Sequence, residues 1–284
     1  MNPKFQLPKC LTSFHLKVIA IVSMLIDHFA YIPFASVLSG SYAVKEGTVA
    51  YTGVKQSLLL WVAEHDRVLW ALSDMMHWIG RLAFPLFCFL IVQGFLHTRS
   101  KAKYALRLTV FAIFSEIPYD MAFSGCLLSF KNNNVFFTLL TGLLMIWGIT
   151  KVMQRVDAIG NLKNRCALRK GIYSGVVLVF ALAASFLVSN VLDSSYGASG
   201  VLTILIIFLL QSHPVLALII STFVLAALNF SFVQLFALPS ALLVAMYNQQ
   251  RGRPMKYFFY IIYPAHLLIF VLIAVWLGNW VITA

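Results

Sequence analysis

An ionisable pair interrupts the first long apolar segment of the chain. Asp27 and His28 directly follow residues 18–26, a mainly aliphatic stretch suited to the hydrocarbon core of a bilayer. A charge at mid-bilayer costs about 2.5–3.5 kcal/mol on insertion scales, so such a pair should face other helices or a wet cavity. Imidazole is the side chain best matched to general-base chemistry near neutral pH. Asp27 and His28 are therefore the centre of the candidate site.

Two further apolar segments carry charge. Pro85 lies four residues after Arg81, and because proline has no N–H, we expect a kink with a freed carbonyl at Arg81. Glu116 and Asp120 are spaced to share one helix face, and they need a cation such as Arg81 or protonated His28 between them. A structural role, as a proline kink and an interhelical salt bridge, stays open for these residues.

The partner of His28 is not fixed by its neighbour. Successive residues on a helix point about 100° apart, so Asp27 need not orient the imidazole of His28. A carboxylate from another helix, Glu116 or Asp120, is an alternative.

Other candidate residues lie near the ends of apolar segments. A group of cations follows the second segment and suits the phosphates of a cytosolic cofactor, although the positive-inside rule explains it equally well. This group is His97, Arg99, Lys101 and Lys103. Asn134, Tyr196 and His266 are candidates for lining a substrate entrance, although Asn134 also suits a helix cap.

The composition is that of a polytopic helical membrane protein. The chain is 61% hydrophobic with a mean hydropathy of +0.88, and its 11% of charged residues compares with about 25% in soluble domains. We expect an all-α fold with about nine transmembrane helices and the N-terminus in the cytoplasm, which places the C-terminus outside. The expected spans lie near 14–37, 75–97, 103–123, 134–152, 171–191, 198–211, 214–230, 232–247 and 257–280. The expected orientation makes 38–74 a long external loop.

The charge and the cysteines exclude other classes. The net charge of +12 comes from basic residues gathered in short loops between apolar segments, which argues for membrane topology and against nucleic-acid binding. The four cysteines are scattered, without the spacing of a metal site or a disulfide framework. We expect no metal and no cleaved signal peptide.

The whole chain, 1–284, resembles a single TraX-family domain. The matching motifs are LIDH at 25–28, IGRLAFPLF at 79–87, GFLHTR at 94–99, SEIPYD at 115–120 and NVFFT at 134–138, with weaker ones at 196–197, 256–260 and 263–266. The resemblance implies an integral membrane acetyltransferase in a bacterial cytoplasmic membrane. The founding member acetylates the N-terminus of pilin, and the family is similar to wider multispan acyltransferases such as the lysosomal heparan glucosaminide N-acetyltransferase.

The resemblance also implies roles for the candidate residues. Cytosolic acetyl-CoA is the expected donor, and an amine or hydroxyl of an extracytoplasmic protein or glycan is the expected acceptor. His28 is the expected general base, oriented by Asp27 or by a carboxylate of the third span, with Arg81 near the thioester oxygen. Arg99, Lys101 and Lys103 are expected to meet the CoA phosphates.

Two hypotheses from other functional classes stay open. In a proton-coupled transporter or flippase, a proton relay would use Asp27, His28, Glu116 and Asp120. The lack of a visible internal repeat counts against it. In a non-catalytic assembly factor, the buried charges would be structural only. Dependence on acyl-CoA separates the acetyltransferase from both.

Overall fold

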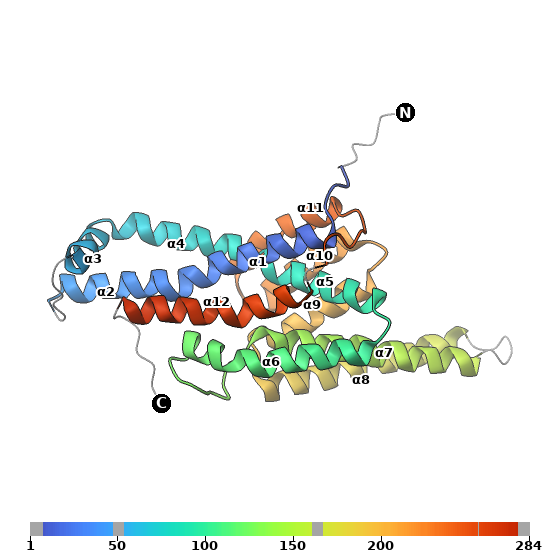
Figure 1. The fold of residues 1–284 in the computed structure, drawn as a ribbon. Coiled ribbons are helices and arrows are strands. Elements are labelled where there is room, and N and C mark those ends of the chain that lie inside the picture. Colours follow the sequence, from blue (N-terminus) through green and yellow to red (C-terminus); the bar gives the residue numbers. More distant parts are fainter. Residues whose placement is uncertain (1–7, 48–53, 161–166, 255, 278–284) are drawn as a thin grey trace. The chain divides into compact units, whose positions relative to one another are not determined.

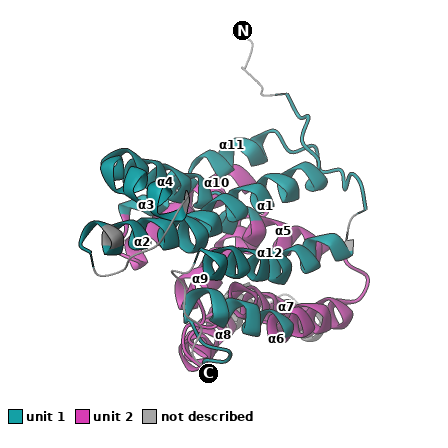
Figure 2. Ribbon diagram, turned by 60° about the vertical axis from the view of Figure 1, so that its left-hand side comes forward, with its two compact units in different colours: residues 1–86, 114–129, 232–284 teal, residues 87–113, 130–231 magenta. Residues whose placement is uncertain are grey.

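The chain folds into helices. The computed structural model describes residues 8–47, 54–160, 167–254 and 256–277, and every regular element within them is helical (Figure 1). The predicted all-α class is confirmed. The chain divides into two compact units, shown in teal and magenta in Figure 2. Unit 1 comprises Met1–Leu86, Phe114–Ser129 and Phe232–Ala284, and unit 2 comprises Phe87–Ile113 and Phe130–Ser231.

Unit 1 is built around the N-terminal helix. Its elements are α1 (Ser13–Phe29), the π-helix η1 (Ala30–Phe34), α2 (Ala35–Lys45), α3 (Val54–Glu64), α4 (Asp66–Gly80), the 3₁₀-helix η2 (Phe232–Ala237), α11 (Pro239–Ala245) and α12 (Lys256–Trp276). The start of α5 (Ala83–His97) and the end of α6 (Lys101–Phe123) also belong to it. Helix α1 packs against both α4 and α12 (Figure 1).

Local sequence explains both ends of α1. Thr12 caps its start, because the Thr12 hydroxyl accepts from the backbone N–H of His15 and the His15 ring accepts from the backbone N–H of Thr12. At the other end, Pro33 has no N–H, so it interrupts the regular hydrogen-bond ladder. The chain widens there into the π-helix, and the N–H of Ala35 reaches back to the carbonyl of Ala30. Such π-turns are frequent at functional sites, and this one begins two residues after His28.

A glycine sets the approach of α4 to α1. A Cβ added at Gly80 would lie 2.4 Å from the Cβ of Asp27, a separation that real side chains do not adopt. Only glycine therefore lets the two backbones come this close. Along α12, Leu267 and Val271 are fully buried in the same unit.

Unit 2 contains the middle of the chain. Its elements are most of α5 (Ala83–His97), the first part of α6 (Lys101–Phe123), α7 (Val135–Gly160), α8 (Ala167–Leu192), α9 (Gly197–Leu209) and α10 (Pro214–Leu228). Helix α9 packs against α7, α8 and α10. Gly142 of α7 leaves room for the side chain of Ile204 of α9, and Leu143, Ile146 and Leu218 are buried.

Within the described residues, five helical segments are long and apolar enough to cross a membrane. They are Ser13–Ser41, Asp66–His97, Val135–Arg155, Gly175–Leu192 and Tyr257–Trp276, and each overlaps a predicted span. The other predicted spans are also helical: 103–123 falls in α6, and the rest fall in the shorter apolar segments α9, α10 and η2–α11. The count of nine spans and the orientation stay predictions, and residues 278–280 of the last predicted span lie outside the described part.

Two local predictions were wrong. The segment 38–74 is not a long loop, because α2, α3 and the start of α4 lie in it; residues 48–53 are outside the described part. Its scattered charges suggested a loop, but they lie among apolar residues that form helices. The predicted kink at Pro85 is instead a break between α4 and α5 at Arg81. Pro85 lies in the first turn of α5, where an N–H has no intrahelical partner to lose.

Candidate functional site

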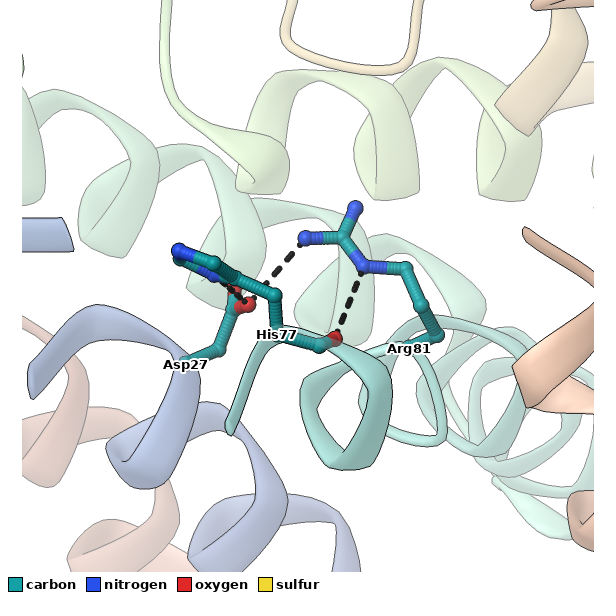
Figure 3. Close-up of polar contacts among 3 residues, drawn as sticks. All are labelled: Asp27, His77 and Arg81. Atoms are coloured by element: carbon teal, nitrogen blue, oxygen red, sulfur yellow. Dashed lines mark hydrogen bonds and ion pairs between the residues drawn. The ribbon is translucent and has the colours of Figure 1, made fainter. Parts of the chain in front are cut away.

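The carboxylate of Asp27 joins α1 to α4. Its Oδ1 accepts from Nδ1 of His77 at 2.9 Å and from Nη2 of Arg81 at 3.1 Å, and Nε of Arg81 donates to the carbonyl of His77 at 3.2 Å (Figure 3). The three side chains are mostly buried, with exposed fractions of 15% for Asp27, 21% for His77 and 14% for Arg81. Partial burial strengthens the ion pair because it excludes water from around the charges. The guanidinium balances the charge of the carboxylate.

The contact with Asp27 fixes which nitrogen of His77 can act as a base. A carboxylate oxygen only accepts, so Nδ1 of His77 carries the proton. In the neutral ring, Nε2 is then the nitrogen with a lone pair. A carboxylate on Nδ1 is the arrangement that orients the base in a Ser-His-Asp triad. The ring of Tyr31 packs against His77, with centroids 4.2 Å apart.

A second histidine pair joins α1 to α12. Nδ1 of His28 lies 2.7 Å from Nε2 of His266, and the two ring planes are nearly parallel, at 12°. Nδ1 of His266 lies 2.7 Å from the carbonyl of Ile262, which only accepts, so this nitrogen carries the proton. In the neutral rings, Nε2 of His266 must accept and Nδ1 of His28 must donate. Nε2 of His28 is therefore left as a base.

Aromatic rings connect the two pairs. The ring of Phe123, from α6, meets the ring of His28 edge-on with centroids 5.4 Å apart, and the ring of Tyr31 with centroids 6.0 Å apart. Tyr31 in turn contacts His77, and Tyr263 packs near His28 at 6.2 Å. Both histidines therefore belong to one aromatic-lined cluster within unit 1.

The predicted catalytic residues are partly brought together. Asp27 and Arg81 meet, whereas His28 bonds to His266 and not to a carboxylate. Glu116 and Asp120 are both buried in α6. Oδ2 of Asp120 accepts from the backbone N–H of Ser129 at 2.6 Å, which ties this carboxylate to its own loop. The hydrogen-bond partner of His28 is therefore an imidazole, where a carboxylate was expected.

Sequence reasoning missed His77, and it predicted His266 as an entrance residue and not as the partner of His28. His77 lies near the start of the predicted span 75–97, and no role was predicted for it. Its spacing held a signal, because it stands four residues before Arg81 and therefore on the same face of a helix. Asp27 and Tyr31 have the same spacing on α1 and η1, so two such faces meet.

The predicted cofactor cations surround the connection between α5 and α6 in unit 2. Nδ1 of His97 bonds to the carbonyl of Gln93 at 2.8 Å, and Nζ of Lys101 donates to the carbonyl of Thr98 at 2.7 Å. Arg99 and Lys103 have exposed side chains. His97 is also exposed, and Lys101 is partly buried.

Two of the three predicted entrance residues, Asn134 and Tyr196, lie in unit 2, whereas His266 lies in unit 1 and pairs with His28. Asn134 is fully buried, and its side chain caps α7 by accepting from the N–H of Phe136 at 2.9 Å and donating to the carbonyl of Ala112 at 2.8 Å. The helix-cap alternative therefore describes Asn134. Tyr196 immediately precedes α9. The loop before α7 pairs with the loop before α9, because the N–H of Asn133 donates to the carbonyl of Asp193 at 2.7 Å.

A comparison with protein families decides what kind of chain this is. The sequence model of the family described as TraX protein matches residues 13–274, which include every residue of the cluster described above. The chain belongs to the TraX family. In the described part of this TraX-family protein, no group of three histidine, cysteine or acidic residues is arranged to hold a metal ion.

A curated relative has a name that concerns fimbriae. It is the probable fimbrial assembly protein FimC, serogroup H1, of Dichelobacter nodosus, which is 30% identical over 142 residues. The alignment covers 48% of this chain and 45% of the relative, so the chain spans less than half of the length of that protein. No solved structure matches the chain.

Proposed function

We propose that the protein is a membrane-embedded acetyltransferase, which moves the acetyl group of cytosolic acetyl-CoA to an amine or hydroxyl of an extracytoplasmic acceptor. Membership of the TraX family supports this proposal, and the fimbrial assembly relative supports a pilin-like protein as one class of acceptor. The observation that carries the proposal is the hydrogen-bond chain from His28 through His266 to the Ile262 carbonyl, which leaves Nε2 of His28 as a base.

The chemistry follows from this tautomer. Nε2 of His28 takes a proton from the acceptor while the acceptor nitrogen or oxygen attacks the thioester carbon. The C–S bond then breaks, and the CoA sulfur leaves with the proton that His28 releases. His266 keeps the ring of His28 in place and shares its positive charge through their hydrogen bond. The guanidinium of Arg81 stabilises the negative charge that develops on the thioester oxygen.

The residues that bind the phosphates of the donor are proposed from charge and exposure alone. The exposed cations Arg99, just before α6, and Lys103, in its first turn, are proposed to bind CoA phosphates through charge-assisted hydrogen bonds. No metal takes part in this proposal, since base, orienting group and cation are all side chains of the chain itself.

Release of free CoA from acetyl-CoA tests the proposal without knowledge of the acceptor. Purified protein in detergent is compared with His28→Ala and with His213→Ala, which removes an exposed histidine outside the cluster. We expect wild type and His213→Ala to release CoA, and His28→Ala to be slower by about 10²–10⁴-fold. A folded His28→Ala protein with full turnover would remove His28 from the chemistry. No release by wild type, together with no thermal stabilisation by CoA, would refute the acetyltransferase.

A proton-coupled transporter is the second candidate, because buried carboxylates are the usual parts of a membrane proton relay. Glu116 and Asp120 are buried in α6, and Asp27 is paired with His77. This candidate predicts uptake into proteoliposomes driven by a pH gradient without acetyl-CoA. The acetyltransferase predicts consumption of acetyl-CoA without any gradient.

A further inference from the structure

The cluster holds a second oriented imidazole that the proposed chemistry has not used. His77 is held by Asp27 at 2.9 Å, just as His28 is held by His266 at 2.7 Å. Each ring thus donates from Nδ1 and keeps a lone pair on Nε2. The rings of Tyr31 and Phe123 link the two histidines. Two bases in one cluster point to two proton transfers.

An ion pair alone does not require this arrangement. Arg81 already supplies the charge that Asp27 needs, through the 3.1 Å contact to Oδ1. His77 nevertheless donates to that same oxygen, and Gly80 is the residue that lets the carboxylate reach it. The groups that face His77 are Asp27 and Tyr31, from α1 and η1, and Arg81 from its own helix. The carboxylate would stabilise an imidazolium at His77 when it takes up a proton.

We propose that His77, oriented by Asp27, is a second general base, which removes the proton that an acceptor ammonium must lose before it can attack. This inference rests on the proposed acetyltransferase. An α-amino group has a pKa of about 7.7–8.0, so it is mainly an ammonium at neutral pH. Such a group must give up two protons to become an amide nitrogen, whereas a hydroxyl gives up one.

The steps balance with both histidines in use. Nε2 of His77 takes the first proton from the ammonium, and the neutral amine attacks the thioester carbon, forming the C–N bond. Nε2 of His28 takes the second proton, the C–S bond breaks, and that proton passes to the CoA sulfur. The partly exposed His77 returns its proton to water. The sum is ammonium plus acetyl-CoA giving amide, CoA thiol and one proton.

Two substitutions separate a base from a structural hydrogen-bond donor. His77→Asn keeps an N–H donor near Nδ1 for Asp27 but removes the basic nitrogen. His77→Gln is a second neutral variant, in case the first fails to fold. Both are compared with wild type and His28→Ala, and the folded state of each variant is checked by thermal unfolding. The assay measures CoA release from acetyl-CoA with glycinamide as the amine acceptor, at pH 6.5 and pH 9.

The expected result is a defect that depends on pH. At pH 6.5 only about one α-amine in twenty is neutral, so His77→Asn should be slower than wild type by up to about 20-fold. At pH 9 the amine is already neutral, and the rate of His77→Asn should recover. His28→Ala should stay slow at both values, because the second proton must still be removed.

Other results contradict the second base. Equal rates of wild type and His77→Asn at pH 6.5 would show that His77 has no part in proton transfer. An equal loss at both pH values would show a structural role only. If glycinamide fails to accelerate CoA release by wild type, a second base that serves an amine acceptor is likewise contradicted. If wild type releases no CoA and is not stabilised by it, the acetyltransferase itself is refuted, whereas an active wild type with a silent His28→Ala leaves only the role of His77 in question.

Discussion

Replacing Gly80 by alanine tests whether the close approach of α4 to α1 holds the site together. The new Cβ would lie 2.4 Å from Cβ and 2.5 Å from Oδ1 of Asp27, whereas ordinary contacts begin near 3.4 Å. The Cβ of Asp27 is fixed to its backbone and cannot swing away. The two helices must therefore separate by roughly 1 Å. That shift would stretch the contacts of Asp27 to His77 and Arg81, now 2.9 and 3.1 Å, beyond hydrogen-bond distance.

The cost of this substitution can be estimated from its parts. Overpacking costs about 1–3 kcal/mol, and losing hydrogen bonds to a charged group costs about 1.5–3 kcal/mol. The better helix propensity of alanine returns about 0.5–1 kcal/mol. The net loss is about 2–5 kcal/mol of unfolding free energy. A displacement of this size should also slow turnover by about 100-fold.

A second glycine gives a matched control. Gly148 in α7 has nothing within 4 Å of an added Cβ, so Gly148→Ala should keep or slightly raise stability. Thermal unfolding in detergent and CoA release are measured for both variants. If Gly80→Ala unfolds at the same temperature as Gly148→Ala and turns over like wild type, the contact between α1 and α4 at Asp27 does not hold the site.

Three further predictions address the remaining groups. His266→Phe should slow CoA release by about 10²-fold, because His28 loses the acceptor that orients it, while thermal stabilisation by CoA persists; unchanged turnover would contradict the orienting role. The double variant Arg99→Ala/Lys103→Ala should raise the KM for acetyl-CoA and leave kcat unchanged, whereas an unchanged KM with lower yield would show a role in topology only. Asn134→Ala should lower the unfolding free energy by about 1–2 kcal/mol without changing the KM for acetyl-CoA, and a raised KM would favour a binding role over the helix cap.

The positions of the helices were largely predictable from sequence. The number of helices that cross a membrane and their orientation were less so. Long apolar runs located α1, α7, α8 and α12 because hydrocarbon selects composition over a whole helix. The segment 38–74 was expected to be a loop, but its charges lie among apolar residues that form α2, α3 and the start of α4. The kink predicted at Pro85 was also wrong, because proline suits the first turn of a helix as well as a kink.

The charged residues of the candidate site could be predicted from sequence, but their partners could not. Ionisable residues in apolar segments pointed to Asp27, His28 and Arg81, because burying a charge costs free energy unless the group is paired or serves a function. The partners themselves depend on which helices pack together, and no single segment of sequence contains that information. His77 and His266 are supplied by α4 and α12, which lie 50 and 238 residues away from the groups that they bind.

Asp27 and His28 are adjacent in sequence, yet they bind side chains of two different helices. Neighbouring residues on a helix point about 100° apart, so a helix packed on two sides directs them to two different neighbours. Asp27 faces α4 and binds His77, whereas His28 faces α12 and binds His266. An Asp-His pair in one helix resembles a catalytic dyad in sequence, yet here each residue completes a different dyad. Because the two dyads have separate orienting groups, either histidine can be disabled while the hydrogen bond that holds the other stays in place.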